Sequence, residues 1–171
     1  MFGITTAADF REKSARDNAA LQADVSNVDV AINAILSAYH LHEWVWRLVL
    51  KPRKPVSVRG AVLRNSDDWK TWLDQNFPHF GLLRDLANGS KHCVPVSNAG
   101  KVEGYGQGPY GVGPYGKPYL LIDQGQAFSP EARWLVGNRV VREAAEFWAA
   151  LDAELNFSNS SPVDPQIAGT H

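Results

Sequence analysis

The chain has 171 residues, of which 44% are hydrophobic, enough for a single domain with one core. Its formal net charge of −1 excludes a protein that binds nucleic acid through an overall positive charge. Any contact with nucleic acid would have to use a local basic patch. The single cysteine, Cys93, excludes an intramolecular disulfide. The sequence opens with no signal segment and contains no apolar run long enough to span a membrane, so we expect a soluble cytoplasmic protein.

Two helices are predicted at the beginning of the chain. Residues 7–23 are rich in alanine and charge and predict a surface helix. Ser26 or Asn27 can cap the next helix, predicted from Val28 to Leu50, which is the longest and most apolar of the chain. Opposite its apolar face runs a polar stripe roughly 80° wide. The stripe contains Asp29, Asn33, His40, Glu43 and Arg47.

His42 falls in the middle of the apolar face of this second helix. We interpret it as a core histidine that is hydrogen-bonded to a neighbouring helix.

Residues 51–64 carry five basic residues, no acid and two prolines that stop the helix. Two interpretations are open for this segment. It is either a clamp for phosphates or a solvated connection whose first cations lie favourably beside a helix C-terminus, and we favour the connection.

The next helix is predicted from Ser66 to Asn76, with Ser66 as its N-cap. Trp69 and Trp72 recur at helical spacing and are expected in the core rather than in a ligand platform.

The segment from Phe80 to His92 combines an apolar face with a face dense in polar groups. In an α-helix, at roughly 100° per residue, five polar residues fall within about 120° of one another. They are Arg84, Asp85, Asn88, Lys91 and His92. These groups can bind an anion or move a proton, so Arg84, Asn88, Lys91 and His92 are candidate catalytic residues. Asn88-Gly89 is also a common helix stop, and a helix ending there would move Lys91 and His92 off the shared face.

Two short strands are predicted at residues 93–96 and 119–123, forming one hairpin. Between them Gly-Pro-Tyr-Gly occurs twice at a spacing of five. Its tyrosines either stack on bases or, as we favour, fold back on the bundle. The last helix opens at Ser129 as N-cap with Pro130 at its first position, and its core stripe runs from Trp134 to Leu155.

These elements predict a mostly α protein, an up-and-down bundle of four to five helices with one β-hairpin inserted before the last helix. Residues 1–157 form the single domain, with the hairpin insertion at about 93–125, and residues 158–171 form a flexible tail. A site in such a bundle is built from facing helices. We therefore expect the stripe of the second helix to face the polar side of the 80–92 helix, with Asn33, His40, Glu43 and Arg47 as binding residues.

The segments Tyr39-His40-Leu41-His42-Glu43-Trp44-Val45-Trp46 and Leu86-Ala87-Asn88-Gly89-Ser90-Lys91-His92 resemble a family of bacterial proteins for which no activity is established. That family carries a His, an acid and a Trp in one helix and Leu-Ala-Asn-x-x-Lys-His in another. The resemblance covers roughly residues 28–93 and implies a common fold and site, but no reaction.

A more distant similarity is to HEPN domains, helical bundles that include many metal-independent ribonucleases. In those enzymes an Arg and a following His act on the ribose 2′-hydroxyl and the scissile phosphate. The similarity implies these roles for Arg84 and His92, although the seven residues between them exceed that motif's interval.

The patterns leave three hypotheses for function. The favoured one is a non-enzymatic interaction or ligand-binding protein in which the His, Lys, Asn and Arg cluster forms a buried polar network with His40 and Glu43. The second is a HEPN-like ribonuclease or nucleotide-binding protein that uses His92 with Arg84 and Lys91. The third is a metal site at His40, Glu43 and His92. No cofactor is predicted, RNA or a nucleotide is the only partner class indicated, and a homodimer is left open.

Overall fold

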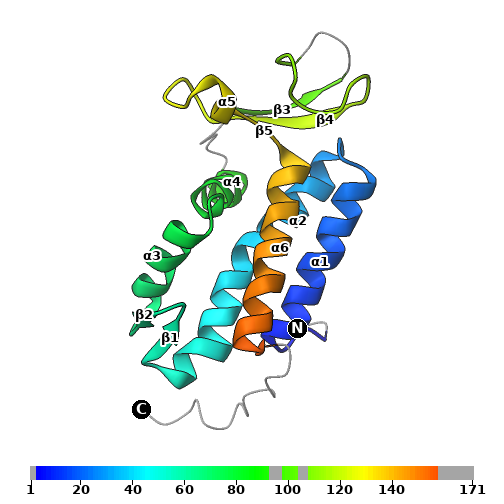
Figure 1. Cartoon of the computed structure of the whole chain (residues 1–171). Helices are drawn as coiled ribbons and strands as arrows, with labels where there is room; N and C mark the ends of the chain where they lie inside the picture. Colours follow the sequence, from blue (N-terminus) through cyan, green and yellow to red (C-terminus); the bar gives the residue numbers. More distant parts are fainter. Residues whose placement is uncertain (1–2, 93–97, 104–107, 158–171) are drawn as a thin grey trace.

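Within the described part of the chain, the helical periodicity of the sequence forms six α-helices, and five short strands lie between them (Figure 1). The computed structural model describes residues 3–92, 98–103 and 108–157, and it describes no side chains for residues 90–99. The predicted mostly α class is confirmed within these ranges. The predicted tail and the strand predicted at 93–96 lie outside them.

Local caps fix the first two helices. Helix α1 (Ala7–Ala23) has the predicted bounds and begins with a capping box, in which the hydroxyl of Thr6 accepts from the Asp9 amide and the Asp9 carboxylate accepts from the Thr6 amide. Helix α2 (Val28–Val45) is capped by Asn27, whose side chain accepts a hydrogen bond from the Val30 amide at 3.2 Å.

The helical chain continues beyond α2, but with a different winding. A π-helical turn, η1 (Trp46–Leu50), is followed by a 3₁₀ turn, η2 (Lys51–Arg53). Pro52 has no N–H to donate to the carbonyl of Leu48, so the regular α pattern cannot continue there. The Lys51 amide instead bonds to the Trp46 carbonyl, which closes the wider turn.

The predicted solvated connection after this turn is wrong in part, because strands β1 (Val56–Val58) and β2 (Ala61–Leu63) form an antiparallel hairpin. Its two central residues, Arg59 and Gly60, both have positive φ, as a tight type I′ turn requires. The Arg59 guanidinium contacts both carboxylate oxygens of Glu154 and thereby ties the hairpin to the last helix.

Helices α3 (Ser66–Asn76) and α4 (Phe80–His92) also have the predicted bounds. The cap of α3 is not Ser66, as predicted, but Asn65, whose side-chain oxygen accepts from the amides of Asp67 and Asp68 at 2.8 and 2.9 Å. Helix α4 runs through Asn88-Gly89, so the alternative stop there is wrong.

A three-stranded sheet precedes the last helix, where a single hairpin was predicted. Strand β4 (Tyr119–Asp123) pairs on one side with β3 (Asn98–Val102) and on the other with β5 (Trp134–Val136), all antiparallel. The predicted last helix is therefore interrupted. Ser129 and Pro130 open only the one-turn helix α5 (Pro130–Arg133), and the long helix α6 (Gly137–Leu155) starts after β5.

In the described part of the loop between β3 and β4, Gly108 and Gly113 pack against Tyr119, whose hydroxyl donates to the Val112 carbonyl at 2.8 Å. A Cβ on Gly113 would lie 2.5 Å from the Tyr119 ring, so only glycine fits this position. Tyr110 and Tyr115 are exposed, and the prediction that these tyrosines fold back on the bundle is wrong for both.

Helices α1, α2 and α6 lie side by side, and the sheet covers one end of them (Figure 1). Helices α1 to α3 alternate in direction, as an up-and-down bundle requires, but α4 lies crosswise and α6 runs in the direction of α2 (Figure 1). Buried tryptophans join α3 and α6 to α2. The indole of Trp69 donates to the His42 carbonyl and that of Trp148 to the Ala38 carbonyl, both at 3.0 Å.

None of the described helices combines the length and the apolar character needed to cross a bilayer.

Candidate functional site

The polar face of α4 is only partly open to a ligand. Arg84 contacts two carboxylates, Asp74 at 3.4 Å and Asp85 at 3.5 Å, so much of its charge is already compensated. Asn88 is exposed. The side chains of the other two catalytic candidates, Lys91 and His92, lie outside the described part of the structure, so only their place on the helix is given.

Aromatic contacts join α2 to α4. The Tyr39 and Phe80 rings lie 5.6 Å apart, and the His42 and Phe80 rings lie 5.2 Å apart. Burial raises the pKa of the Tyr39 phenol, and the nearby Glu43 carboxylate adds to the effect.

His42 is buried, as predicted, but its hydrogen-bond partner lies in its own helix. Its Nδ1 is 2.6 Å from the Tyr39 carbonyl oxygen, one turn earlier in α2. Burial lowers the pKa of the imidazole, so the neutral form is favoured in the fold.

The polar stripe of α2 faces solvent. Asp29 and Asn33 are exposed, and the side chains of His40 and Glu43 retain 41% and 56% of their accessible surface. His40 Nδ1 and Glu43 Oε1 are 3.7 Å apart, a weak pair in water. The predicted buried polar network is therefore wrong for its described members, because His40, Glu43 and Asn88 are not buried.

Two of the predicted binding residues, Glu43 and Arg47, do come together at a surface pocket of about 300 Å³. The pocket lies where the beginning of α1 meets the end of α2, and Thr5, Trp44 and Leu48 complete its lining. Trp44 belongs to the motif that carries the family resemblance, but no sequence pattern pointed to Thr5 or Leu48, because the pocket arises only when the two helix ends pack together.

The walls of this pocket are held by local contacts. The Trp44 ring stacks on Phe10 at 4.8 Å with an interplanar angle of 13°. The amide and the hydroxyl of Thr5 both donate to the Asp9 carboxylate, at 2.8 and 3.1 Å. Hydrogen bonds from the amides of Thr5 and Thr6 lower the pKa of Asp9 to about 2, so the carboxylate that holds this wall remains charged.

The π-helical turn η1 supplies Arg47 and Leu48 to the pocket. Turns of this kind occur mostly as short interruptions of α-helices and frequently at functional sites. A Glu four residues before an Arg usually forms an ion pair on a regular helix. Among the residues that the structure describes, however, no ion pair within 4 Å joins Arg47 to Glu43 or to any other carboxylate. The pocket therefore holds two opposite charges that do not neutralise each other by direct contact.

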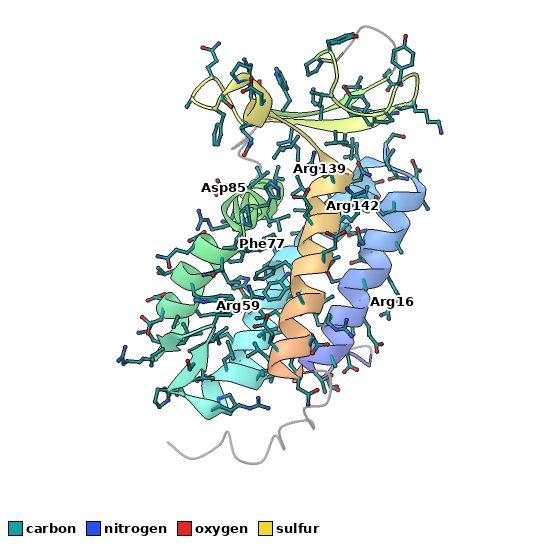
Figure 2. The ribbon with its side chains drawn as sticks, viewed as in Figure 1. Arg16, Arg59, Phe77, Asp85, Arg139 and Arg142 are labelled. Atoms are coloured by element: carbon teal, nitrogen blue, oxygen red, sulfur yellow. The ribbon has the colours of Figure 1, made fainter. Side chains whose placement is uncertain are left out.

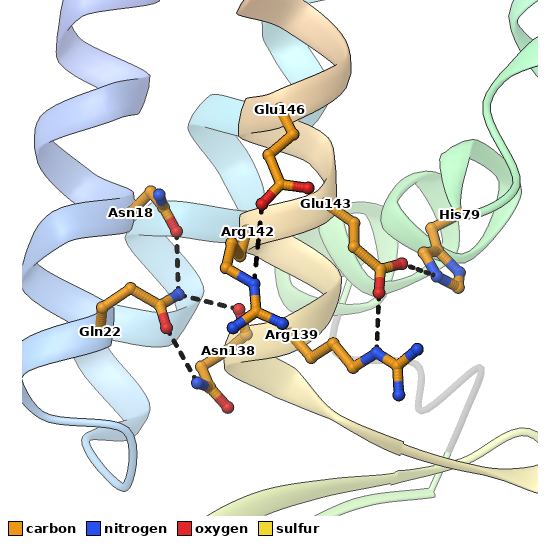
Figure 3. Close-up of polar contacts among 8 residues, drawn as sticks. All are labelled: Asn18, Gln22, His79, Asn138, Arg139, Arg142, Glu143 and Glu146. Carbon is orange, nitrogen blue, oxygen red and sulfur yellow. Dashed lines mark hydrogen bonds and ion pairs between the residues drawn. The ribbon is translucent and has the colours of Figure 1, made fainter.

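A second polar cluster, which the sequence did not predict, joins the beginning of α4 to α6 (Figure 3). His79 Nε2 lies 2.7 Å from Glu143 Oε2, and Arg139 donates to Oε1 of the same carboxylate at 2.7 Å. Partial burial raises the pKa of Glu143, but the hydrogen bonds from Arg139 and His79 outweigh it and leave the pKa below its ordinary value. Because both carboxylate oxygens are engaged, the cluster acts as a structural link rather than an open site.

No three His, Cys, Asp or Glu side chains gather into a possible metal site within the described ranges. The metal hypothesis at His40 and Glu43 also needs His92, whose side chain is not described.

Comparisons of the chain with models of protein families, with curated proteins and with solved structures found no match.

Proposed function

We propose that the protein is a cytoplasmic helical-bundle module that binds a small polar ligand in the pocket lined by Thr5, Glu43, Trp44, Arg47 and Leu48. Binding at this pocket is a more specific function than that of a general interaction module, because the pocket gives the binding site a defined location.

One observation carries this function: Glu43 and Arg47 line the same pocket and are not paired with each other. Small-molecule sites are concave and combine apolar walls with a few convergent polar groups that orient the ligand. Trp44 and Leu48 supply the apolar wall, while the carboxylate and the guanidinium supply groups of opposite charge.

The pocket suits binding better than catalysis. A general acid or base must be in reach of a reacting group and must usually have a shifted pKa. The titratable groups of α2 with shifted pKa, Tyr39 and His42, are turned into the α2–α4 contact and are not among the residues that line the pocket. Asp9, whose pKa is lowered, accepts hydrogen bonds from Thr5 and is engaged in holding the wall.

The test is a screen of small metabolites by NMR, followed at the tryptophan indole N–H signals. The chain has six tryptophans, of which Trp44 lines the pocket, so the others serve as internal controls. A pocket ligand is expected to shift the Trp44 signal, assigned through Trp44→Phe, and to leave that of Trp134 in strand β5 unchanged. A library that shifts no Trp44 signal, or that shifts all indoles alike, would count against the function.

The ribonuclease hypothesis is retained as a second candidate because α4 is unbroken from Arg84 to His92. An unbroken helix keeps Arg84, Asn88 and Lys91 at spacings of four and three residues, which belong to one helix face. Incubation with structured and single-stranded RNA in EDTA tests this candidate. Cleavage that is lost in both His92→Ala and Arg84→Gln would support it, whereas RNA left intact by the folded wild-type protein would dismiss it.

A further inference from the structure

We infer that the ligand of this pocket is a zwitterion of the α-amino-acid class with an apolar or aromatic side chain. The inference rests on the proposed function and names the chemistry that the pocket would select.

The two charges at the pocket match the two charges of such a ligand. A guanidinium binds a carboxylate through paired N–H donors, and a carboxylate binds an ammonium group. Arg47 and Glu43 carry these groups four residues apart. A ligand that carries an ammonium and a carboxylate on one carbon can engage both groups at once, whereas a simple anion meets repulsion from Glu43 and a simple cation meets repulsion from Arg47.

The uncompensated state of Arg47 strengthens this assignment. Three other Glu/Arg pairs at the same spacing do form ion pairs on regular helices: Glu12 with Arg16 and Arg142 with Glu146 at 3.8 Å, and Arg139 with Glu143 at 2.7 Å. The pair at the pocket differs in that Arg47 belongs to the π-helical turn η1. The Arg47 guanidinium is exposed and has no carboxylate within 4 Å among the described residues, so it is available to a ligand.

The apolar wall accounts for the side chain of the ligand. Trp44 and Leu48 line the pocket, and the stacking of Trp44 on Phe10 fixes its ring. The volume of about 300 Å³ lies at the lower end of the range of small-molecule sites, about 300–1,000 Å³, and suits a single small metabolite.

Two further ionisable groups lie close to Glu43 and Arg47 in the chain, His40 and Lys51. His40 lies 3.7 Å from Glu43 and competes for its carboxylate when the imidazole is protonated. Lys51, four residues beyond Arg47 in the chain, is exposed in the turn η2 and carries a further positive charge.

Three probes of one shape separate the two charges: L-phenylalanine, phenethylamine, which lacks the carboxylate, and 3-phenylpropionate, which lacks the ammonium group. Each is titrated into the wild-type protein and followed at the Trp44 indole signal. L-Phenylalanine is expected to bind more tightly than either analogue, by about two- to fivefold, the range that exposed charge pairs support.

Two variants assign the charges to their partners. Arg47→Gln is expected to remove the advantage of L-phenylalanine over phenethylamine, and Glu43→Gln its advantage over 3-phenylpropionate. The matched controls are Arg16→Gln and Glu12→Gln, on the outer side of α1, where Figure 2 labels Arg16. Neither control is expected to change the affinity for L-phenylalanine relative to that for either analogue. Because Glu43 and Arg47 are both exposed, their substitution should leave the fold intact, which circular dichroism checks.

The outcomes distinguish this inference from the proposed function. If other small metabolites shift the Trp44 signal while the three probes do not, or if the analogues bind as tightly as L-phenylalanine, the zwitterion assignment is overturned and the binding function remains. If no compound shifts the signal, both are overturned.

Discussion

Trp69→Phe should destabilise the fold by about 2 kcal/mol, because the indole of Trp69 joins α3 to α2. The side chain is fully buried, and its Nε1–H donates to the His42 carbonyl at 3.0 Å. Loss of this hydrogen bond costs about 1 kcal/mol. The smaller ring leaves a cavity of roughly 40 Å³, which costs about another 1 kcal/mol at about 24 cal/mol per Å³. The His42 carbonyl still accepts from the Trp46 amide, so no further penalty for an unpaired group is expected.

Urea unfolding followed by circular dichroism measures this loss, and the melting temperature should fall by about 4 to 8 °C. Trp134→Phe is the control, because Trp134 is only partly buried, in strand β5. A loss for Trp69→Phe below about 0.5 kcal/mol, or no larger than that of the control, would refute the stabilising role of the indole contact.

Three further predictions concern the loop over the sheet and two ionisable groups. Gly113→Ala should release the loop from Tyr119, seen as a change in the ring signals of Tyr119, whereas Gly111→Ala, with a similar positive φ but open space around it, should not. Arg133 holds the pKa of Asp123 at about 2, so the stability from this pair is present above about pH 4 and is lost as the pH falls towards 2. Acid unfolding of Arg133→Gln should therefore begin at a higher pH than that of the wild type, and equal acid midpoints would contradict this. Burial lowers the pKa of His42, so the contribution of the neutral imidazole to stability is present above pH 6.5 and is lost as the pH falls. His42→Phe should therefore reduce the loss of unfolding free energy between pH 7 and 5. An unchanged slope of unfolding free energy against pH would argue against this.

The sequence predicted the bounds of α1, α3 and α4 because their periodicity and flanking residues are strong. It missed the hairpin β1–β2 and the strand β5 for a common reason. Strands of three residues, such as Trp134–Val136, give the same apolar pattern as one turn of helix, and only their pairing with a distant segment, here Leu121 to Asp123, decides between the two. The cap of α3 differed by one residue, because Asn65 and Ser66 are both good N-caps.

The sequence indicated which residues of α2 share a face, but not which element completes the pocket, and the reason is related. Periodicity tells which residues share a helix face, but not which other element that face contacts. It placed Glu43 and Arg47 on one stripe and predicted α4 as their partner, whereas these two residues line a pocket that is completed by Thr5 just before α1. The π-helical turn that carries Arg47 could not be predicted either, since its winding has no distinct apolar pattern.

The most direct test of the binding function is a titration of small polar metabolites followed at the Trp44 indole signal, in the wild type and in the double variant Glu43→Gln, Arg47→Gln. The pocket predicts at least one compound with a saturable shift at Trp44 that weakens in the double variant while the Trp134 signal stays fixed. Absence of any saturable shift, or a shift of equal affinity in the wild type and the double variant, would contradict a binding site formed by these two charges.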